Sequence, residues 1–384
     1  MQRLLMILFC AFAHLAAAQP YGIGEQTTEF VDASRSNRQV LVEIFYPADA
    51  NGIEVPVSAG AFPVVAVGHG FFMAFSAYQS LWSALVPEGF VVVVLKSEGG
   101  LAPSHENFGL DLAFVLAEMK QANTDNTSLF FEHIAPTSAI MGHSMGGGAS
   151  FLGASSSADA TTVVTFAPAE TTPSAIAAAA SIIIPSLIIT GSLDCIAPTA
   201  AHGQPIFDAL ASSCKVMVDI SGASHCQFAD ANFPCEIGEV SCPTAATITR
   251  EQQHNLQFGL VLPWLRYHLL SDFLAWGNFM AFAENDSLTV QNSCAAPTAT
   301  VSTQNRAVQV WPNPSDGGKI RVTLPDVVGV CDVIVYDALG TVMSKHLVRD
   351  STTEVDLSGF PRGLYYLRVV QWGGFSETVS FTVL

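Results

Sequence analysis

Residues 137–151 read TSAIMGHSMGGGASF and contain the most informative pattern in the chain. A short apolar strand, 139–141, runs into GHSMG at 142–146, and a helix of small residues follows. This is the G-x-S-x-G pattern in a strand–turn–helix setting, where a sharp turn presents the serine at the tip of a sheet. Glycines on either side leave room for neighbouring backbone. The stretch therefore predicts that Ser144 is an activated serine in an α/β protein.

The composition points to a globular, acidic protein. Half of the 384 residues are hydrophobic and 12% are charged, which excludes a disordered chain and leaves room for more than one domain. The net charge of −18 is uneven: residues 19–303 hold 7 Lys+Arg and 25 Asp+Glu, whereas 304–384 hold 7 and 8. So large an excess of carboxylates argues against nucleic acid or an anionic membrane as partner and favours solubility outside the cell.

Residues 1–18 have the features of a secretory signal peptide. MQR precedes an apolar run, 4–15, and three alanines stand before Gln19. No later segment is long and apolar enough to span a bilayer. Of the eight cysteines, Cys10 lies in this leader, so seven remain, and an oxidising compartment would pair most of them.

Cysteine spacing suggests one short loop and no metal centre. Cys235 and Cys242 are close enough in sequence to close a loop through a disulfide. The chain has no C-x-x-C pair and no close Cys/His cluster, so no zinc or other metal site is predicted.

Apolar runs alternate with helical stretches along most of the chain. Continuous apolar runs are typical of strands buried on both faces, and their alternation with helices predicts a mostly parallel sheet with helices on both sides. Two antiparallel strands, 29–33 and 39–46, are expected before it. The segment 167–181 is too short for a large cap domain, which predicts an open site. The expected buried strands are 62–68, 90–95, 161–166, 182–190 and 216–220, and the expected helices are 76–86, 104–121, 200–213 and 252–270.

The character of the chain changes at Ala295. Residues 295–305 are polar and rich in Pro and Thr, as in a linker. Residues 306–384 alternate with period two between glycine-containing turns, which predicts a small all-β sandwich. The expected organisation is a signal peptide at 1–18, a catalytic α/β domain at 19–294, the linker at 295–305, and the sandwich at 306–384.

A base and an acid for Ser144 follow two later strands. A serine needs a histidine to take its proton and a carboxylate to orient that histidine, and in such sheets the chain order is Ser, acid, His. Asp194 ends GSLD at 191–194, just after one strand, and His225 ends GASH at 222–225, just after the next. We therefore assign Asp194 as orienting acid and His225 as general base.

The oxyanion formed on attack needs backbone N–H donors already in place. Met145 directly follows the nucleophile and supplies one candidate. Phe71 lies in the loop after strand 62–68 and supplies the other. We expect the neighbouring Phe72 and His105 to line the substrate site, with Ile196 in the turn that follows Asp194.

Residues 21–290 resemble the α/β-hydrolase superfamily, and within it the chlorophyllase, dienelactone hydrolase and bacterial cutinase or polyester hydrolase branch. The resemblance implies ester hydrolysis through an acyl-enzyme, with an ester substrate and no cofactor. The chain departs from the polyester hydrolases at Ala169, a further expected lining residue, where that family has an aromatic. Cutinase-like enzymes often have a disulfide near the acid and the base, which implies a Cys195–Cys226 pair. The motifs that carry the resemblance are HGF at 69–71, GHSMGG at 142–147, DCIAP at 194–198 and GASH at 222–225.

Residues 306–384 resemble the C-terminal sorting domain of the type IX (Por) secretion system. The resemblance implies export through the periplasm, followed by release or attachment to the outer cell surface. The alternative is an adhesive or substrate-binding module. The matching pieces are VWPNP at 310–314, VYDALG at 335–340 and DLSGFPRGLYY at 356–366.

The sequence thus predicts a secreted, monomeric serine ester hydrolase acting on a small-molecule, lipid or polymer ester. One alternative is a lipase or peptidase on the same triad, although the absence of a large cap disfavours a lid-gated lipase. The other is a catalytically silent surface binding protein with the hydrolase fold. The complete Ser–Asp–His set disfavours the silent protein, since such a protein has no need of all three.

Overall fold

A computed structural model describes residues 21–294, 308–324, 331–337, 342–348, 352–371 and 375–384. The predicted signal peptide and linker lie outside these residues. The chain divides into two compact units, one formed by residues up to 263 with 279–294, the other by 264–278 with the residues from 295 onward.

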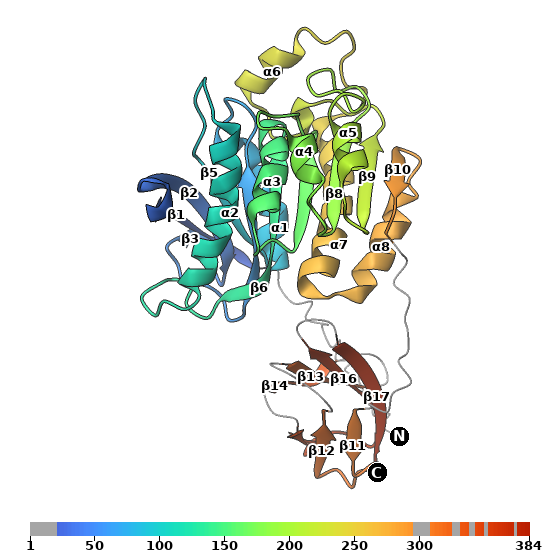
Figure 1. Ribbon diagram of the computed structural model, residues 1–384. Helices are drawn as coiled ribbons and strands as arrows, with labels where there is room; N and C mark the ends of the chain where they lie inside the picture. The colour runs from blue at the N-terminus through green and yellow to red at the C-terminus, as the bar shows by residue number, and fades with distance from the viewer. Residues whose placement is uncertain (1–20, 295–307, 325–330, 338–341, 349–351, 372–374) are drawn as a thin grey trace, which may run out of the picture. The chain divides into compact units, whose positions relative to one another are not determined.

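The first unit is built on a ten-stranded, mostly parallel sheet, so the predicted fold class is confirmed (Figure 1). The strand order is β10-β9-β8-β7-β6-β4-β5-β2-β1-β3, and all neighbours from β5 to β9 are parallel. β1 and β2 form the expected antiparallel start. The strands are β1 (Gly22–Asp32), β2 (Arg38–Ala48), β3 (Gly52–Ile53), β4 (Phe62–Gly68), β5 (Val91–Leu95), β6 (Ile134–His143), β7 (Thr162–Phe166), β8 (Ser186–Gly191), β9 (Lys215–Ile220) and β10 (Leu288–Asn292).

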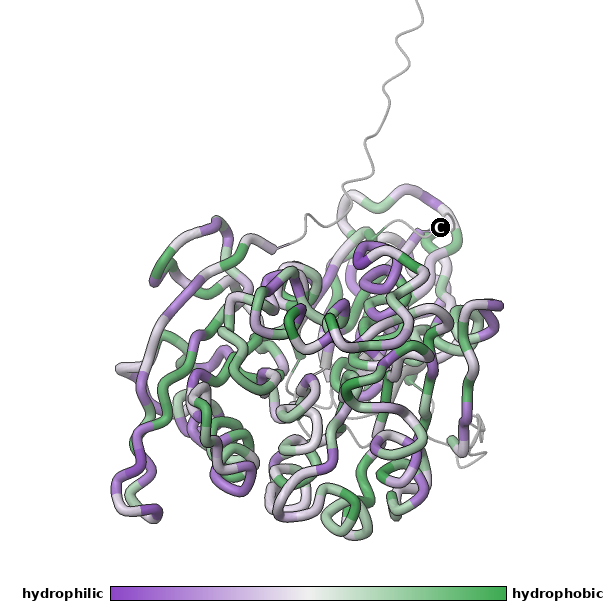
Figure 2. The backbone as a smooth tube through the Cα atoms, turned by 90° about the horizontal axis from the view of Figure 1, so that it is seen from above, coloured by the Kyte–Doolittle hydropathy of each residue, from purple (hydrophilic) through white to green (hydrophobic). Residues whose placement is uncertain are grey.

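Helices cover both faces of this sheet. In Figure 1, α2, α3 and α4 lie in front of the sheet and α1 lies behind it. Figure 2 shows hydrophobic and hydrophilic stretches that alternate along the backbone. The helices are α1 (Gln79–Leu85), α2 (His105–Ala122), α3 (Met145–Ser156), α4 (Ala175–Ala179), α5 (Gly203–Ala209), α6 (Phe233–Glu239), α7 (Arg250–Leu270) and α8 (Phe273–Ala283).

The buried strands and several helix ends follow the sequence closely. Every residue of β5 has no exposed surface, as predicted for a continuous apolar run between two helix layers. Ser104 caps α2 by accepting a hydrogen bond from the N–H of Asn107 (3.2 Å). Three helices and two strands of the first unit were not predicted, namely α4, α6, α8, β3 and β10. No helix in the described part of the chain is both long and apolar enough to cross a membrane.

The C-terminal residues form the predicted small all-β sandwich, as far as they are described. One sheet has the order β11-β12-β15 and the other β14-β13-β16-β17. Buried residues of both sheets, including Ile320, Val355, Val333 and Leu367, share one core. The strands are β11 (Gln309–Trp311), β12 (Lys319–Thr323), β13 (Cys331–Asp337), β14 (Val342–Val348), β15 (Thr352–Asp356), β16 (Gly363–Gln371) and β17 (Phe375–Val383).

Candidate active site

Ser144 lies in a strained turn between β6 and α3. Its φ of 55° and ψ of −120° place a side-chain-bearing residue in a region that costs free energy and persists only where the surroundings enforce it. The Ser144 N–H donates to the carbonyl of Phe166 (3.0 Å), and the Ser144 carbonyl accepts from the N–H of Ala169 (2.9 Å). Both partners lie at or just beyond the end of β7, so the neighbouring strand holds the turn.

Two glycines let the backbone close around this turn. A Cβ on Gly142 would lie 2.2 Å from the carbonyl oxygen of Gly146. A Cβ on Gly146 would lie 2.2 Å from the carbonyl oxygen of Gly68, the last residue of β4. No side chain fits at such distances, so the G-x-S-x-G glycines are required by close backbone packing.

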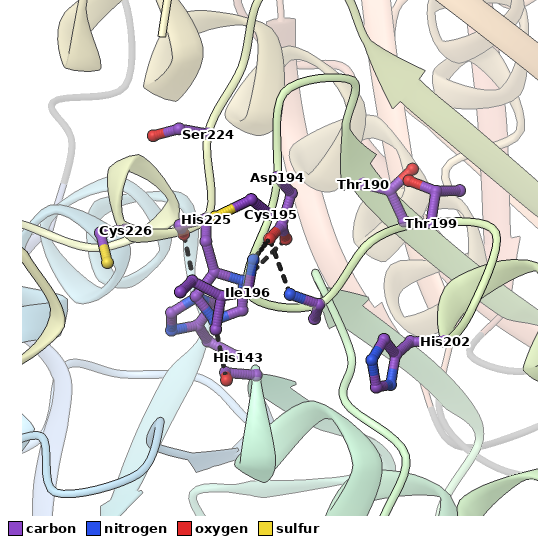
Figure 3. Close-up of polar contacts among 12 residues, drawn as sticks. His143, Thr190, Asp194, Cys195, Ile196, Thr199, His202, Ser224, His225 and Cys226 are labelled. Carbon is purple, nitrogen blue, oxygen red and sulfur yellow. Dashed lines mark hydrogen bonds and ion pairs between the residues drawn. The ribbon is translucent and has the colours of Figure 1, made fainter. Parts of the chain in front are cut away.

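Ser144, His225 and Asp194 form a continuous hydrogen-bonded set. His225 Nε2 lies 2.8 Å from Ser144 Oγ, and His225 Nδ1 lies 2.7 Å from Asp194 Oδ2. The other carboxylate oxygen of Asp194 accepts from the backbone N–H group of Ile196 (2.9 Å; Figure 3) and from that of Ala197 (2.8 Å). All three side chains of the set are buried. The residues that the sequence placed on three separate strand ends are therefore brought together in the arrangement that chemistry requires.

A second series of hydrogen bonds ends at the backbone carbonyl of His225. The N–H of Gly70 donates to Tyr78 Oη (2.7 Å), Tyr78 Oη lies 3.0 Å from His143 Nδ1, and His143 Nε2 lies 3.1 Å from the carbonyl oxygen of His225. A carbonyl only accepts, so Nε2 of His143 carries the proton and Nδ1 accepts from the tyrosine. Burial, and then the neighbouring His225, hold the pKa of His143 well below its ordinary value, so its ring stays neutral.

No role was predicted from the sequence for the side chains of His143 and Tyr78. Both side chains are fully or almost fully buried, and they link the loop after β4 to the backbone of the catalytic base. No local signal predicts such a link, because Tyr78 and His143 are 65 positions apart.

The two predicted oxyanion donors lie at the expected places in the fold. Met145 is the first residue of α3, and the first N–H groups of a helix have no partner within it. Phe71 lies in the loop after β4, and among the described residues no hydrogen-bond acceptor is found for its N–H. The Phe71 side chain is 50% exposed and that of Phe72 is 46% exposed. Their assigned roles stay predictions.

The loop that contains Ala169 is held on both sides by histidines. His202 Nδ1 accepts from the N–H of Glu170 (2.9 Å), and His105 Nδ1 accepts from the N–H of Thr172 (3.2 Å). His105 is the first residue of α2, so it connects that helix to the loop after β7. The expected lining residue Ile196 is 41% exposed. The lining roles of these residues are untested.

Both predicted disulfides are wrong. Cys195 pairs with Cys242 and Cys226 pairs with Cys235, in each case with Cα atoms 5.6 Å apart. A further disulfide joins Cys214 to Cys294. The residues that follow the acid and the base, Cys195 and Cys226, do not bond to each other, because a segment carrying α6 folds over both and supplies each with its own partner.

Cys235 and Cys242 do not close a loop with each other. Cys235 lies within α6 and Cys242 lies just beyond its end, and each bonds to a cysteine of a different loop. The helix has a recognisable start, because Asn232 accepts from the N–H of Cys235 (3.1 Å) and Pro234 stands in the first turn. This Asn-x-Pro pattern is the signal that sequence reasoning missed.

Comparison with known proteins agrees with the geometry. "Cutinase" from Thermobifida fusca is 28% identical over 217 residues, which cover 54% of this chain and 69% of the relative. "Cutinase est1" from Thermobifida alba is 29% identical over 268 residues, which cover 67% of this chain and 85% of the relative. "Bis(hydroxyethyl) terephthalate hydrolase" from Streptomyces coelicolor is 27% identical over 187 residues, covering 47% and 54%.

Two families match the chain in succession. Residues 309–380 match the secretion system C-terminal sorting domain, which indicates secretion to the cell surface or the extracellular space. Residues 15–242 match the PET hydrolase-like family. The predicted serine esterase is thereby confirmed, and the chain belongs to the PET hydrolase-like family as a cutinase-like serine ester hydrolase joined to a Por-type sorting domain.

Proposed function

We propose that this protein hydrolyses ester bonds of a water-insoluble aliphatic polyester through an acyl-enzyme on Ser144. The observation that carries the proposal is the unbroken contact from Ser144 Oγ through His225 to Asp194, at 2.8 and 2.7 Å. Both distances lie within the reach needed for direct proton transfer and orientation.

The reaction divides into two steps. His225 takes the hydroxyl proton as Ser144 attacks the ester carbonyl, and the N–H groups of Phe71 and Met145 stabilise the oxyanion. The tetrahedral intermediate collapses to the acyl-enzyme, and His225 gives its proton to the departing alcohol. Water, activated by the same histidine, then attacks the acyl-enzyme and releases the acid and free Ser144. Asp194 remains ionised and stabilises the imidazolium formed in both steps.

Two features support a polymer as substrate, and a third favours an aliphatic one. Between Phe166, where β7 ends, and Ser186, where β8 begins, the only helix is the five-residue α4, so no large cap rises from this segment. The named relatives include cutinases and a terephthalate ester hydrolase. Ala169 offers no ring for stacking against an aromatic monomer, which favours aliphatic chains. We further propose that the secreted protein acts as a monomer.

Film hydrolysis tests the substrate assignment. The full mature chain and Ser144→Ala are assayed on nitrophenyl esters of increasing chain length, then on polycaprolactone and poly(ethylene terephthalate) films, with released acids measured by chromatography. We expect wild type to cleave the soluble esters and to release more acid from the aliphatic film. Soluble-ester activity without any film hydrolysis would reject the polymer, and equal or faster release from the aromatic film would reject the aliphatic preference.

Deletion of residues 304–384 tests the role of the sorting domain. We expect the truncated enzyme to keep its activity on soluble esters and to accumulate in the periplasm of its native host. Normal secretion combined with loss of polymer binding would instead favour a substrate-binding module.

A further inference from the structure

The helix α6 is fastened to both loops that carry the acid and the base. Cys195, next to Asp194, bonds to Cys242 just beyond the helix, and Cys226, next to His225, bonds to Cys235 within it. The N–H of Cys226 also donates to the carboxylate of Glu239 (2.7 Å). Figure 1 shows α6 beyond one end of the sheet, apart from the helices that cover its faces. Its position is thus fixed with respect to the catalytic set.

One side of α6 and its C-cap residue present large apolar side chains to solvent. Phe233 is 75% exposed, Ile237 55% and Val240 83%. Their spacing of i, i+4 and i+7 places them on one side of a helix. The two carboxylates of the helix are engaged elsewhere, since Glu236 pairs with Arg250 (3.1 Å) and Glu239 accepts from Cys226. We call Phe233, Ile237 and Val240 the α6 stripe.

The helix that carries the α6 stripe lies against a residue of the acid-bearing turn. A Cβ added to Gly238 would lie 3.7 Å from Ile196 Cδ1, so the helix packs against Ile196. Ile196 is itself 41% exposed, and its backbone N–H binds the carboxylate of Asp194.

We propose that the α6 stripe, with Ile196, is the surface by which the enzyme docks on a neutral, water-insoluble polyester. This inference rests on the proposed function and adds the residues that bind the solid substrate. Binding of an uncharged apolar surface fits an uncharged apolar stripe, whereas a net charge of −18 opposes an anionic lipid surface. Three side chains bury about 500 Å² at most, less than the roughly 800 Å² per partner of a stable dimer.

The two disulfides connect adsorption on this docking surface to catalysis at Ser144. A rigid link between stripe and catalytic set lets adsorption hold the polymer at a fixed position relative to Ser144, so that adsorbed chain segments meet the site at a high local concentration. A soluble ester reaches Ser144 without adsorption and gains nothing from the stripe. The two substrate types therefore separate docking from chemistry.

The test compares Phe233→Ser/Ile237→Ser/Val240→Ser with a matched control. The control triple Val31→Ser/Ile53→Ser/Ile183→Ser changes exposed apolar residues (51%, 76% and 75%) away from α6. Each full mature protein is assayed for kcat/KM on nitrophenyl butyrate, adsorption to polycaprolactone film, acid release from that film, and binding to neutral and anionic vesicles. We expect the α6 triple to lose at least about tenfold in film adsorption and acid release. Its kcat/KM on the soluble ester should stay within about twofold, and the control triple should match wild type throughout.

Several results would overturn the inference. They are film adsorption unchanged in the α6 triple, an equal loss in the control triple, a loss confined to vesicle binding, and conversion of a wild-type dimer to a monomer in light scattering. An inactive wild type on the soluble ester would instead overturn the proposed function. A fall in soluble-ester activity equal to the fall on film would assign α6 to folding of the active site and would also overturn the docking role.

Discussion

The elbow at 142–146 and the segment carrying α6 hold their places by different means. The elbow is fixed by close backbone packing, with Gly146 against Gly68, and by hydrogen bonds from Ser144 to the end of β7. The α6 segment has no buried residue in its helix and is held by two disulfides and a few polar contacts. The elbow is part of the sheet, whereas α6 is fastened onto it.

This difference assigns separate tasks to the two regions. Residues in the sheet interior cannot shift without disturbing neighbouring strands, which suits the placement of Ser144, His225 and Asp194. A surface segment tied by covalent bonds is free to carry exposed apolar side chains, because folding does not depend on burying them. Substitutions near the elbow should therefore lower the rate of the chemical step. Substitutions near α6 should instead change the free energy of unfolding and the activity on solid substrates.

The largest expected effect comes from Asp194→Asn. The amide keeps the shape of the side chain but favours the wrong tautomer of His225, so kcat should fall by about 10⁴ with little change in melting temperature. Asp219→Asn is the matched control, since Asp219 accepts from Thr190 (2.7 Å) within the same region but does not touch His225. A greater loss in the control than in Asp194→Asn, measured by steady-state kinetics, would contradict the assignment of the acid.

Removal of the Cys195–Cys242 disulfide should have the largest effect on stability around α6. The bond joins residues 47 positions apart, and replacing both cysteines by alanine should lower the free energy of unfolding by about 4 kcal/mol on a chain-entropy basis. The Cys226–Cys235 bond, with a separation of 9, should contribute about 2.5 kcal/mol by the same reasoning.

Chemical denaturation of the two double-alanine variants checks this order. At temperatures where both are folded, we expect activity on soluble esters to persist while hydrolysis of film falls. A larger loss of stability for the short loop would show that strain or contacts, rather than loop length, decide the contribution of each bond.

Tyr78→Phe tests the support behind the histidine. The change leaves the N–H of Gly70 and Nδ1 of His143 without their hydrogen-bond partner, so both the oxyanion loop and the backbone of His225 lose support. We expect kcat to fall about tenfold at an unchanged KM, consistent with loss of a buried hydrogen bond. Tyr46→Phe is the control, because Tyr46 Oη donates to Val55 O (2.7 Å) far from the site. Equal losses of kcat in the two variants would mean that the loss comes from lower overall stability and not from the support of His225.

His143→Gln should change how stability depends on pH. In the folded chain burial lowers the pKa of His143 well below its ordinary value of 6.5, so only the unfolded chain binds the proton as pH falls through that value. Acid therefore destabilises wild type, and the neutral glutamine should weaken the decline in melting temperature between about pH 7.5 and pH 5.5. An unchanged slope in calorimetric scans would mean that His143 protonates in the folded protein.

The sequence allowed the sheet and the catalytic set to be predicted because both follow from local patterns. Buried parallel strands read as continuous apolar runs, and their carboxyl ends place Ser144, Asp194 and His225 at one edge of the sheet. The turn at Ser144 needs glycines at fixed positions, so it can be recognised from the sequence alone.

What could not be predicted depends on contacts between distant parts of the chain. Disulfide connectivity follows from where the α6 segment folds, and sequence spacing alone favoured the pair Cys235–Cys242, whose members bond instead to Cys226 and Cys195. The link from Tyr78 to His143 likewise joins two elements that only the folded sheet brings together.

Labelling with a fluorophosphonate tests whether Ser144 is the nucleophile, because the reagent reacts only with an activated serine. The mature protein is treated with the reagent, and the adduct is mapped by peptide mass spectrometry, alongside Ser144→Ala and His225→Ala. We predict one adduct on Ser144 in wild type, none in Ser144→Ala, and labelling slowed by at least about 10³ in His225→Ala. A folded wild-type protein that resists labelling, or an adduct on another residue, would contradict the account.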